Sequence, residues 1–123
     1  MRRARVSLLA LVLGAAALPA TGQEVAAGSG AVLRGLDRLS GTTTDIRVPT
    51  GAAAIFAGRL SIELRECRYP VANPTGDAYA FVAIRDTATG SALFDGWMIA
   101  AAPALNALDH MRYDVWVLRC TSD

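Results

Sequence analysis

Alternating apolar and polar side chains predict a protein built from β-strands. The clearest example is Arg59–Cys67, in which every second residue from Leu60 to Leu64 is apolar and the residues between are polar. A period of two is typical of a strand with one buried and one exposed face. Strict alternation would leave Cys67 on the polar face. We expect a β-bulge near Glu66 that turns the cysteine inward; the alternative is a cysteine at the rim of the core.

Further segments have strand-like patterns, namely Val32–Leu39, Thr43–Val48, the short Ala53–Phe56, Ala78–Arg85, Ser91–Ala100 and Tyr113–Cys120. Ala78–Arg85 is apolar at both odd and even positions, which predicts a strand buried on both faces. Asp86–Gly90 has the composition of a hairpin loop, in which Gly90 can take positive φ.

Two details of the C-terminal strands carry local predictions. Asp95 and Gly96 lie inside a strand-like segment, and we expect a bulge at Gly96 that re-aims Trp97. In the last strand Cys120 shares its parity with Trp116, so this tryptophan is expected to pack beside the cysteine.

The only convincing helix signal is Pro103–Asp109, because proline suits the first helical turn. Six or seven short strands and one short helix near the C-terminus predict an all-β fold, either a small antiparallel β-sandwich or an open barrel. We expect one such domain at residues 31–123, preceded by a flexible tail at residues 23–30.

The first 22 residues have the pattern of a secretory signal peptide. Arg2, Arg3 and Arg5 form a positive n-region, and a short apolar h-region runs from residue 6 to residue 18. Small residues at Ala20 and Gly22 predict cleavage near one of them. The apolar run is shorter than the roughly 18 to 20 residues that cross a bilayer. We therefore expect an exported, soluble periplasmic protein with no integral membrane segment after cleavage.

The charge of the chain argues against polyanionic partners. All twelve basic residues are arginine, and three of them lie in the predicted signal peptide. The remaining nine face eleven acidic residues. A mildly acidic domain without a basic run is not expected to bind nucleic acid or an anionic membrane.

Two cysteines, Cys67 and Cys120, remain in a chain predicted to reach an oxidising compartment. An even number of cysteines there favours a disulfide. The alternatives are two buried, unpaired thiols, or a metal or redox pair, although no Cys-x-x-Cys spacing is present.

Candidate chemistry is sparse. His110 is the only histidine, and its acidic neighbours Asp109 and Asp114 suggest at most a general base. A polar loop residue is the simpler interpretation. A copper site from His110, Met111 and Met98 is chemically conceivable, but no spacing selects it. We predict no catalytic, metal-binding or cofactor-binding residue.

The C-terminal half carries most of the aromatic residues. At alternating strand positions such residues belong to the core more often than to a binding surface. Trp97, after a glycine and before Met98, is the one that we expect to be an exposed contact. The candidate interaction surface is Trp97, Met98, His110, Tyr113 and Asp114.

Several motifs resemble one known family. They are G-W-M at Gly96–Met98, P-A-L-x-A-L-x-H at Pro103–His110 and Y-D-V-W-x-L-x-C at Tyr113–Cys120, with upstream matches at Val32–Pro49 and Gly58–Cys67. The chain is identified as similar to the DUF2155 family, small exported alphaproteobacterial proteins of unassigned function. The resemblance implies a periplasmic domain with paired cysteines, and it implies no activity. Position 102, often a serine helix cap in this family, is alanine here.

Three functions follow as hypotheses. The leading one is a non-catalytic periplasmic domain that binds or scaffolds another cell-envelope protein or complex. The second is a small-ligand or glycan-binding module with a pocket near Trp97, Tyr113 and Arg85. The third is an enzyme that uses Asp109, His110 and Asp114.

Overall fold

The computed structural model describes residues 10, 12, 14–16 and 22–123. Apart from 10, 12, 14–16 and 22, the predicted signal peptide lies outside these residues, and so does Ala20 of the predicted cleavage region. No helix in the described part of the chain is long and apolar enough to cross a membrane.

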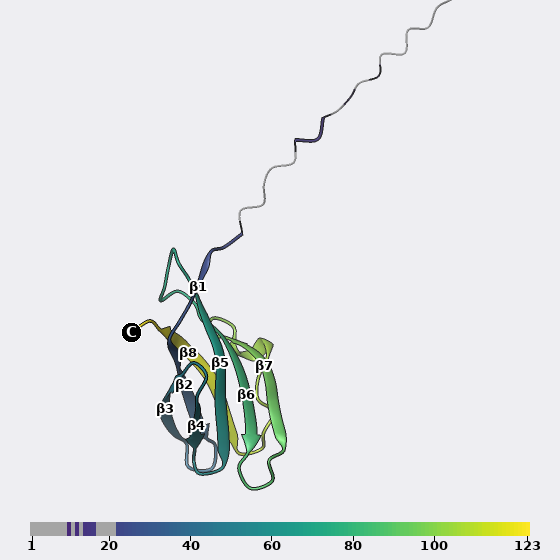
Figure 1. Ribbon diagram of the computed structural model, residues 1–123. Helices are drawn as coiled ribbons and strands as arrows, with labels where there is room; N and C mark the ends of the chain where they lie inside the picture. Colours follow the sequence, from purple (N-terminus) through teal and green to yellow (C-terminus); the bar gives the residue numbers. More distant parts are fainter. Residues whose placement is uncertain (1–9, 11, 13, 17–21) are drawn as a thin grey trace, which may run out of the picture.

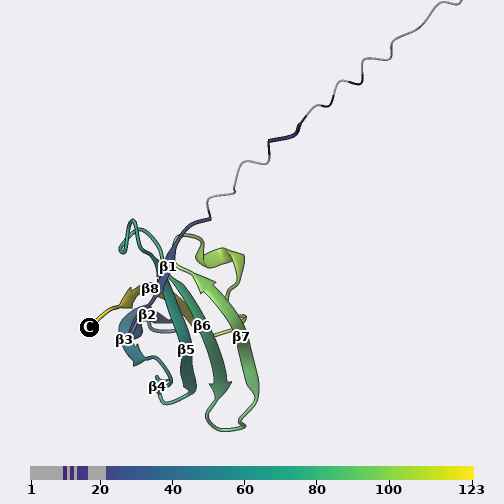
Figure 2. The ribbon, with the colours of Figure 1, turned by 45° about the horizontal axis from the view of Figure 1, so that its top comes forward.

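Within residues 22–123, eight strands form two antiparallel sheets that face each other, as Figures 1 and 2 show. The strands are β1 (Val25–Ala27), β2 (Gly30–Asp37), β3 (Thr42–Pro49), β4 (Ala53–Phe56), β5 (Leu60–Pro70), β6 (Tyr79–Asp86), β7 (Ala92–Ile99) and β8 (Tyr113–Thr121). The larger sheet has the order β1-β5-β6-β7, with β4 also paired to β5, and the smaller has the order β3-β2-β8. The predicted all-β class with antiparallel sheets is confirmed.

The core fills the space between the sheets. The inward-facing side chains of β5 are Leu60, Ile62 and Leu64, and all three are fully buried. The smaller sheet contributes Leu33 of β2 and Val117 of β8 to the same core. Burying an aliphatic side chain of this size contributes about 1.5–3 kcal/mol, so this layer is the main source of cohesion.

One glycine is required by packing between the sheets. Gly35 lies on the inner face of β2, and a Cβ there would come within 2.7 Å of the Phe56 ring. Because Gly35 has no side chain, the Phe56 ring packs against the backbone of β2. The ring also contacts Tyr113 edge-on, with 5.5 Å between the ring centroids.

The bulge expected near Glu66 is confirmed. The β5–β6 register shifts between Leu64 and Glu66, and Cys67 returns to the core with no exposed surface. A second bulge, between Val117 and Arg119 of β8, was not predicted. It reverses the parity of Cys120, so this cysteine lies on the inner side and Trp116 on the outer side. The expectation that Trp116 packs beside the cysteine is therefore wrong.

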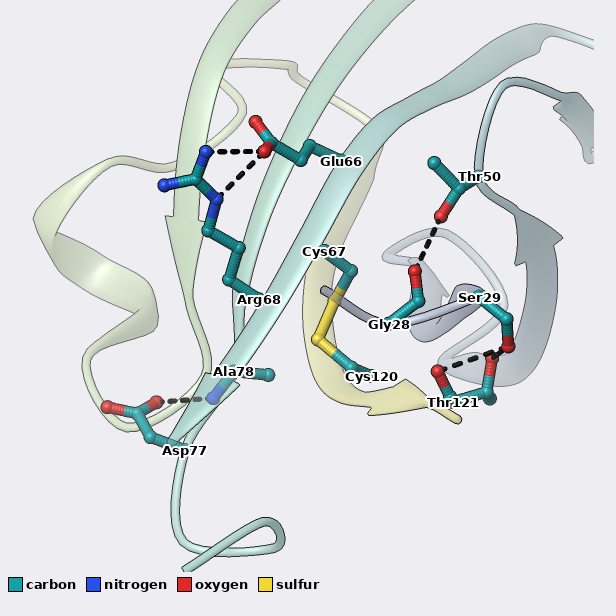
Figure 3. Close-up of a disulfide and its surroundings, with 10 residues drawn as sticks. All are labelled: Gly28, Ser29, Thr50, Glu66, Cys67, Arg68, Asp77, Ala78, Cys120 and Thr121. Atoms are coloured by element: carbon teal, nitrogen blue, oxygen red, sulfur yellow. Dashed lines mark hydrogen bonds and ion pairs between the residues drawn. A yellow bond between two sulfur atoms is a disulfide. The ribbon is translucent and has the colours of Figure 1, made fainter. Parts of the chain in front are cut away.

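The disulfide Cys67–Cys120 joins β5 of one sheet to β8 of the other, with 5.7 Å between the Cα atoms. Figure 3 shows Cys67 pointing toward Cys120, and Glu66 and Arg68 pointing to the opposite side of β5. The bridge therefore links the two sheets covalently across one end of the core.

Three further predictions need correction. Residues 23–30 are not simply a flexible tail, because Val25–Ala27 pairs with Arg68–Pro70 as β1 and β2 begins at Gly30. The helix expected at Pro103–Asp109 is a single 3₁₀ turn over Pro103–Leu105. Ala102 offers no side-chain cap there, and the segment buries only Leu108.

The third correction concerns the strand of Trp97. The irregularity lies at Leu93, where the register with Ile84 and Arg85 shifts, and not at Gly96, which pairs in register with Val82. Without a bulge at Gly96, Trp97 follows the normal alternation and points to the outer face with its partner Phe81.

Candidate functional site

The structure divides the predicted interaction surface into buried and exposed parts. Met98 (2% exposed) and Tyr113 (4% exposed) belong to the core. Trp97 is 37% exposed and lies on the outer face of the larger sheet. Asp114 lies at the start of β8 on the smaller sheet, and His110 lies in the turn that precedes this strand. The five residues therefore do not form one surface, and the buried pair is corrected from surface to core.

His110 stabilises a turn. Its Nδ1 accepts hydrogen bonds from the backbone N–H groups of Arg112 (3.0 Å) and Tyr113 (3.1 Å). Asp114 accepts from the N–H of Val115 at 2.9 Å and lies 3.7 Å from Arg38. Within residues 22–123, neither Asp109 nor Asp114 hydrogen-bonds to the imidazole, whose Nδ1 is engaged by the backbone of the turn.

Metal binding finds no support in the side-chain arrangement either. No three His, Cys, Asp or Glu side chains among those described lie close enough to hold an ion. The two cysteine sulfurs are bonded to each other and leave no thiolate for a metal.

Apolar side chains gather around Trp97 on the outer face of the larger sheet. The strands β6 and β7 supply them at alternating positions, β1 adds one at the edge, and β5 contributes the aliphatic stems of two arginines. We call this surface the aromatic face; its members are Val25, Tyr79, Phe81, Trp97 and Ile99, with the stems of Arg65 and Arg68.

The rings of the aromatic face are held in fixed positions. Phe81 and Trp97 are cross-strand partners, with ring centroids 5.1 Å apart and planes inclined by 31°. Asn106 donates from Nδ2 to the backbone carbonyl of Trp97 at 2.9 Å, which ties the 3₁₀-turn segment to the outer edge of β7. Such an aromatic pair contributes about 0.5–1.5 kcal/mol beyond its buried area.

Two arginines lie over these rings. The guanidinium carbon of Arg65 is 5.2 Å from the Phe81 centroid, and that of Arg68 is 5.6 Å from the Trp97 centroid. Both arginines also have acidic partners. Arg65 makes a bidentate pair with Asp95 (3.1 and 3.3 Å), and Arg68 donates from Nε to Glu66 at 2.8 Å (Figure 3). The aromatic face is thus rigid and close to neutral.

Tyr79 closes the aromatic face near the N-terminal strand. Its hydroxyl donates to Oε1 of Gln23 at 3.1 Å. Burial raises the pKa of Tyr79, and the nearby carboxylate of Asp77 raises it further. The hydroxyl therefore stays protonated and acts as a hydrogen-bond donor.

A shallow hollow of about 300 Å³ lies on the aromatic face. It is lined by Val25, Arg68, Tyr79, Trp97 and Ile99. The hollow is a depression in the sheet surface and not an enclosed pocket. Tyr113 and Arg85, expected to line a pocket with Trp97, are not part of it.

Sequence reasoning found Trp97 but missed its neighbours. The available signal was the segment Tyr79–Ala83, which is apolar on both parities and was interpreted as buried on both sides. One parity, Ala80 and Val82, is fully buried, whereas Tyr79 and Phe81 are only half-buried on the outer face.

The molecule is thus a disulfide-linked antiparallel β-sandwich with an aromatic outer face. The chain belongs to the family described as "Uncharacterized protein conserved in bacteria (DUF2155)", whose model matches residues 31–120. Comparison with curated proteins and with solved structures gives no match.

Proposed function

We propose that this protein is a non-catalytic periplasmic domain that binds another cell-envelope protein through its aromatic face. The observation that carries the proposal is the half-exposed Trp97 ring, stacked against Phe81 and covered in part by Arg68. Tryptophan, tyrosine and arginine are the residues that most often dominate protein–protein binding energy.

The shape and charge of the aromatic face favour a protein as the partner. Its arginines are neutralised by Glu66 and Asp95, so the surface attracts neither a polyanion nor an anionic membrane strongly. A rigid apolar centre with a polar rim is the usual organisation of a specific protein interface. The rigid strands also keep the entropy loss on binding small, because few side chains must be ordered.

Export to the periplasm is part of the proposal. The signal peptide pattern of residues 1–22 supports it, and so does the Cys67–Cys120 disulfide, since such bonds persist in oxidising compartments.

A glycan or small ligand is the second candidate, because the hollow beside Trp97 offers an indole surface with the guanidinium of Arg68 at its side. Sugar rings commonly pack their apolar faces on such aromatic groups. The depression is open, however, and a small ligand would remain largely exposed to solvent in it, whereas binding pockets bury most of their ligand.

The test places a photo-crosslinking residue at the exposed Val25, beside the intact Trp97 on the aromatic face, in the producing cell. A protein that is cross-linked from position 25, and not from the exposed Leu39 at a distant turn, is then purified for direct binding. We expect Trp97→Ala to weaken that binding by about thirtyfold, the effect of losing roughly 2 kcal/mol at a binding hot spot.

Trp116→Ala is the matched control, because it removes the other tryptophan from the outer face of the opposite sheet. Equal loss of binding in both variants, with both folded, would contradict the assignment to the aromatic face. Binding of peptidoglycan fragments that depends on Trp97, without any cross-linked protein, would favour the glycan alternative.

A further inference from the structure

The strand β3 ends the smaller sheet and has an open side. Its eight residues pair with β2 on one side only, and most of its side chains are exposed. Figures 1 and 2 show β3 at the outside of the sandwich. An unpaired strand edge is a template for another strand, and proteins usually block it.

The hydrogen-bonding groups on the open side can be identified from the register. The backbone N–H of Thr50 donates to the carbonyl of Ser29, which lies directly opposite it when the β2–β3 alignment is continued by one residue. Bonded pairs recur at every second residue of an antiparallel ladder, so the even-numbered residues of β3 face β2. The N–H and C=O groups of Thr43, Asp45 and Arg47 therefore point to the open side.

The side chains of Asp45 and Arg47 lie two residues apart on the outer face. Asp45 is fixed by Arg34, whose Nε and Nη2 donate to it at 2.8 and 3.3 Å. Arg47 is exposed and makes no ion pair within the described residues. Charges of a single sign along an edge strand would repel the same strand of a second copy. Here the two charges are opposite and two residues apart, so in an antiparallel pair of β3 strands each charge lies opposite its counterpart.

We propose that β3 pairs antiparallel with β3 of a second copy, with Ile46 opposite Ile46 across a twofold axis. Asp45 of each copy then lies opposite Arg47 of the other. Each Asp45–Arg47 pair exchanges two backbone hydrogen bonds, because both residues present their groups to the open side. Each Thr43–Pro49 pair adds one, since proline has no N–H.

The charges select this register. A pairing centred on Asp45 would bring two carboxylates together and leave Arg47 opposite Thr43, and like charges directly opposite are destabilising. Shifting one strand by a single residue would also turn its apolar side chains to the outer face. The result is a continuous six-stranded sheet with an isologous interface, the commonest form of dimer.

A second copy would also shield apolar surface beside the edge. A cavity of about 350 Å³ lies between β3 and β4, and Ile46, Ile55 and Phe56 are among its lining residues. Ile55 is 59% exposed there. The aromatic face lies on the other sheet and stays free in this dimer.

Sedimentation equilibrium of the protein purified from the periplasm tests the proposal. From about 10 µM to about 1 mM, a range that suits a weak specific association, the mean mass should rise toward that of a dimer. Arg47→Asp and Asp45→Arg should each weaken dimerisation at least tenfold, because both ion pairs become repulsive. An equimolar mixture of the two variants should dimerise again, since one copy then offers two carboxylates and the other two guanidinium groups.

Arg85→Asp is the matched control, because Arg85 is also exposed and makes no ion pair within residues 22–123 but lies on β6 of the larger sheet. It should leave dimerisation unchanged, as should Trp97→Ala. Circular dichroism would establish that each variant is folded. A wild-type protein that stays monomeric throughout, or folded variants whose mixture fails to dimerise, would overturn the proposal.

Discussion

On the outer face of the larger sheet, Arg65 and Arg68 each have an acidic partner and an aromatic ring beneath them. On the outer face of the smaller sheet, Arg47 and Arg119 flank Val32 and have no acidic partner in the part of the chain that is described. Both sheets contribute buried side chains to the core, so the difference concerns what lies on their outer faces.

The comparison separates two ways in which a small sheet protein can offer a binding surface. The aromatic face has its charges satisfied within the chain and leaves apolar surface to be covered, which suits a different protein. At the β3 edge, Asp45 is paired with Arg34, and Arg47 makes no ion pair within the described residues. In our two proposals, the aromatic face accounts for binding to a partner and the β3 edge accounts for self-association.

Removing the disulfide should have the largest effect, because it uncouples the sheets that carry the two faces. We expect Cys67→Ala/Cys120→Ala to lower the free energy of unfolding by roughly 4 kcal/mol, from the chain entropy released by a loop of this length. Urea unfolding measures the loss. Treating the wild type with a reductant should reproduce it, and a loss below about 1 kcal/mol would show that core packing alone holds the sheets together.

Much of the fold could be predicted from sequence because the buried faces follow a simple period. Leu60–Leu64 alternates cleanly, and the bulge before Cys67 followed from a single break in that alternation. Gly90 takes φ of 72° in its hairpin, as its loop composition predicted. These features depend on local patterns in one strand.

What escaped prediction depends on pairing between distant strands. The bulge at Leu118 leaves no local signal, yet it turns Cys120 inward and Trp116 outward. The short β1 exists only because β5 extends far enough to receive it. The helix at Pro103–Asp109 failed because a two-turn segment with one buried leucine gains too little from packing to offset its nucleation.

The candidate site was found only in part for the same reason. Trp97 stands out in the sequence, but its partner Phe81 lies on another strand and is identified only by the register. Met98 and Tyr113 are predicted to belong to the candidate interaction surface together with Trp97, but strand alternation places both side chains inward.

Replacing one arginine on the outer face of each sheet should have the second-largest effect on the free energy of unfolding, and it tests the difference between the two sheets. Arg68→Ala should lower the free energy of unfolding by about 1 kcal/mol, because it removes a cation–π contact and an ion pair. Arg47→Ala should change it by less than about 0.5 kcal/mol, as expected of an isolated surface side chain. The measurement is urea unfolding at low protein concentration, where any dimer is dissociated. Equal losses in both variants would remove the distinction between the faces.

Acidification should have the smallest effect on stability, and Asp45 of the smaller sheet is one of the carboxylates responsible. A hydrogen bond from Arg34 lowers the pKa of Asp45, a hydrogen bond from Arg112 lowers that of Asp37, and the N–H groups of Thr89 and Ala88 lower that of Asp86. A carboxylate whose pKa is lower in the folded than in the unfolded protein stabilises the fold when the pH is above the unfolded-state pKa of 3.8. This stabilisation disappears as the pH falls through the folded-state pKa.

The melting temperature should therefore be level near neutral pH and decline as the pH falls below about 4. Asp86→Ala should melt at a lower temperature than the wild type at pH 7 but lose less on acidification, because one of the three contributing carboxylates is absent. Thermal melts at pH 7 and pH 3 compare the two proteins. An identical decline in both would show that Asp86 does not contribute, and a melting temperature that rises in acid would contradict the sign for all three groups. Because Asp45 also forms half of the proposed β3 pairing, the same acidification should dissociate the dimer while Trp97 keeps its place on the aromatic face.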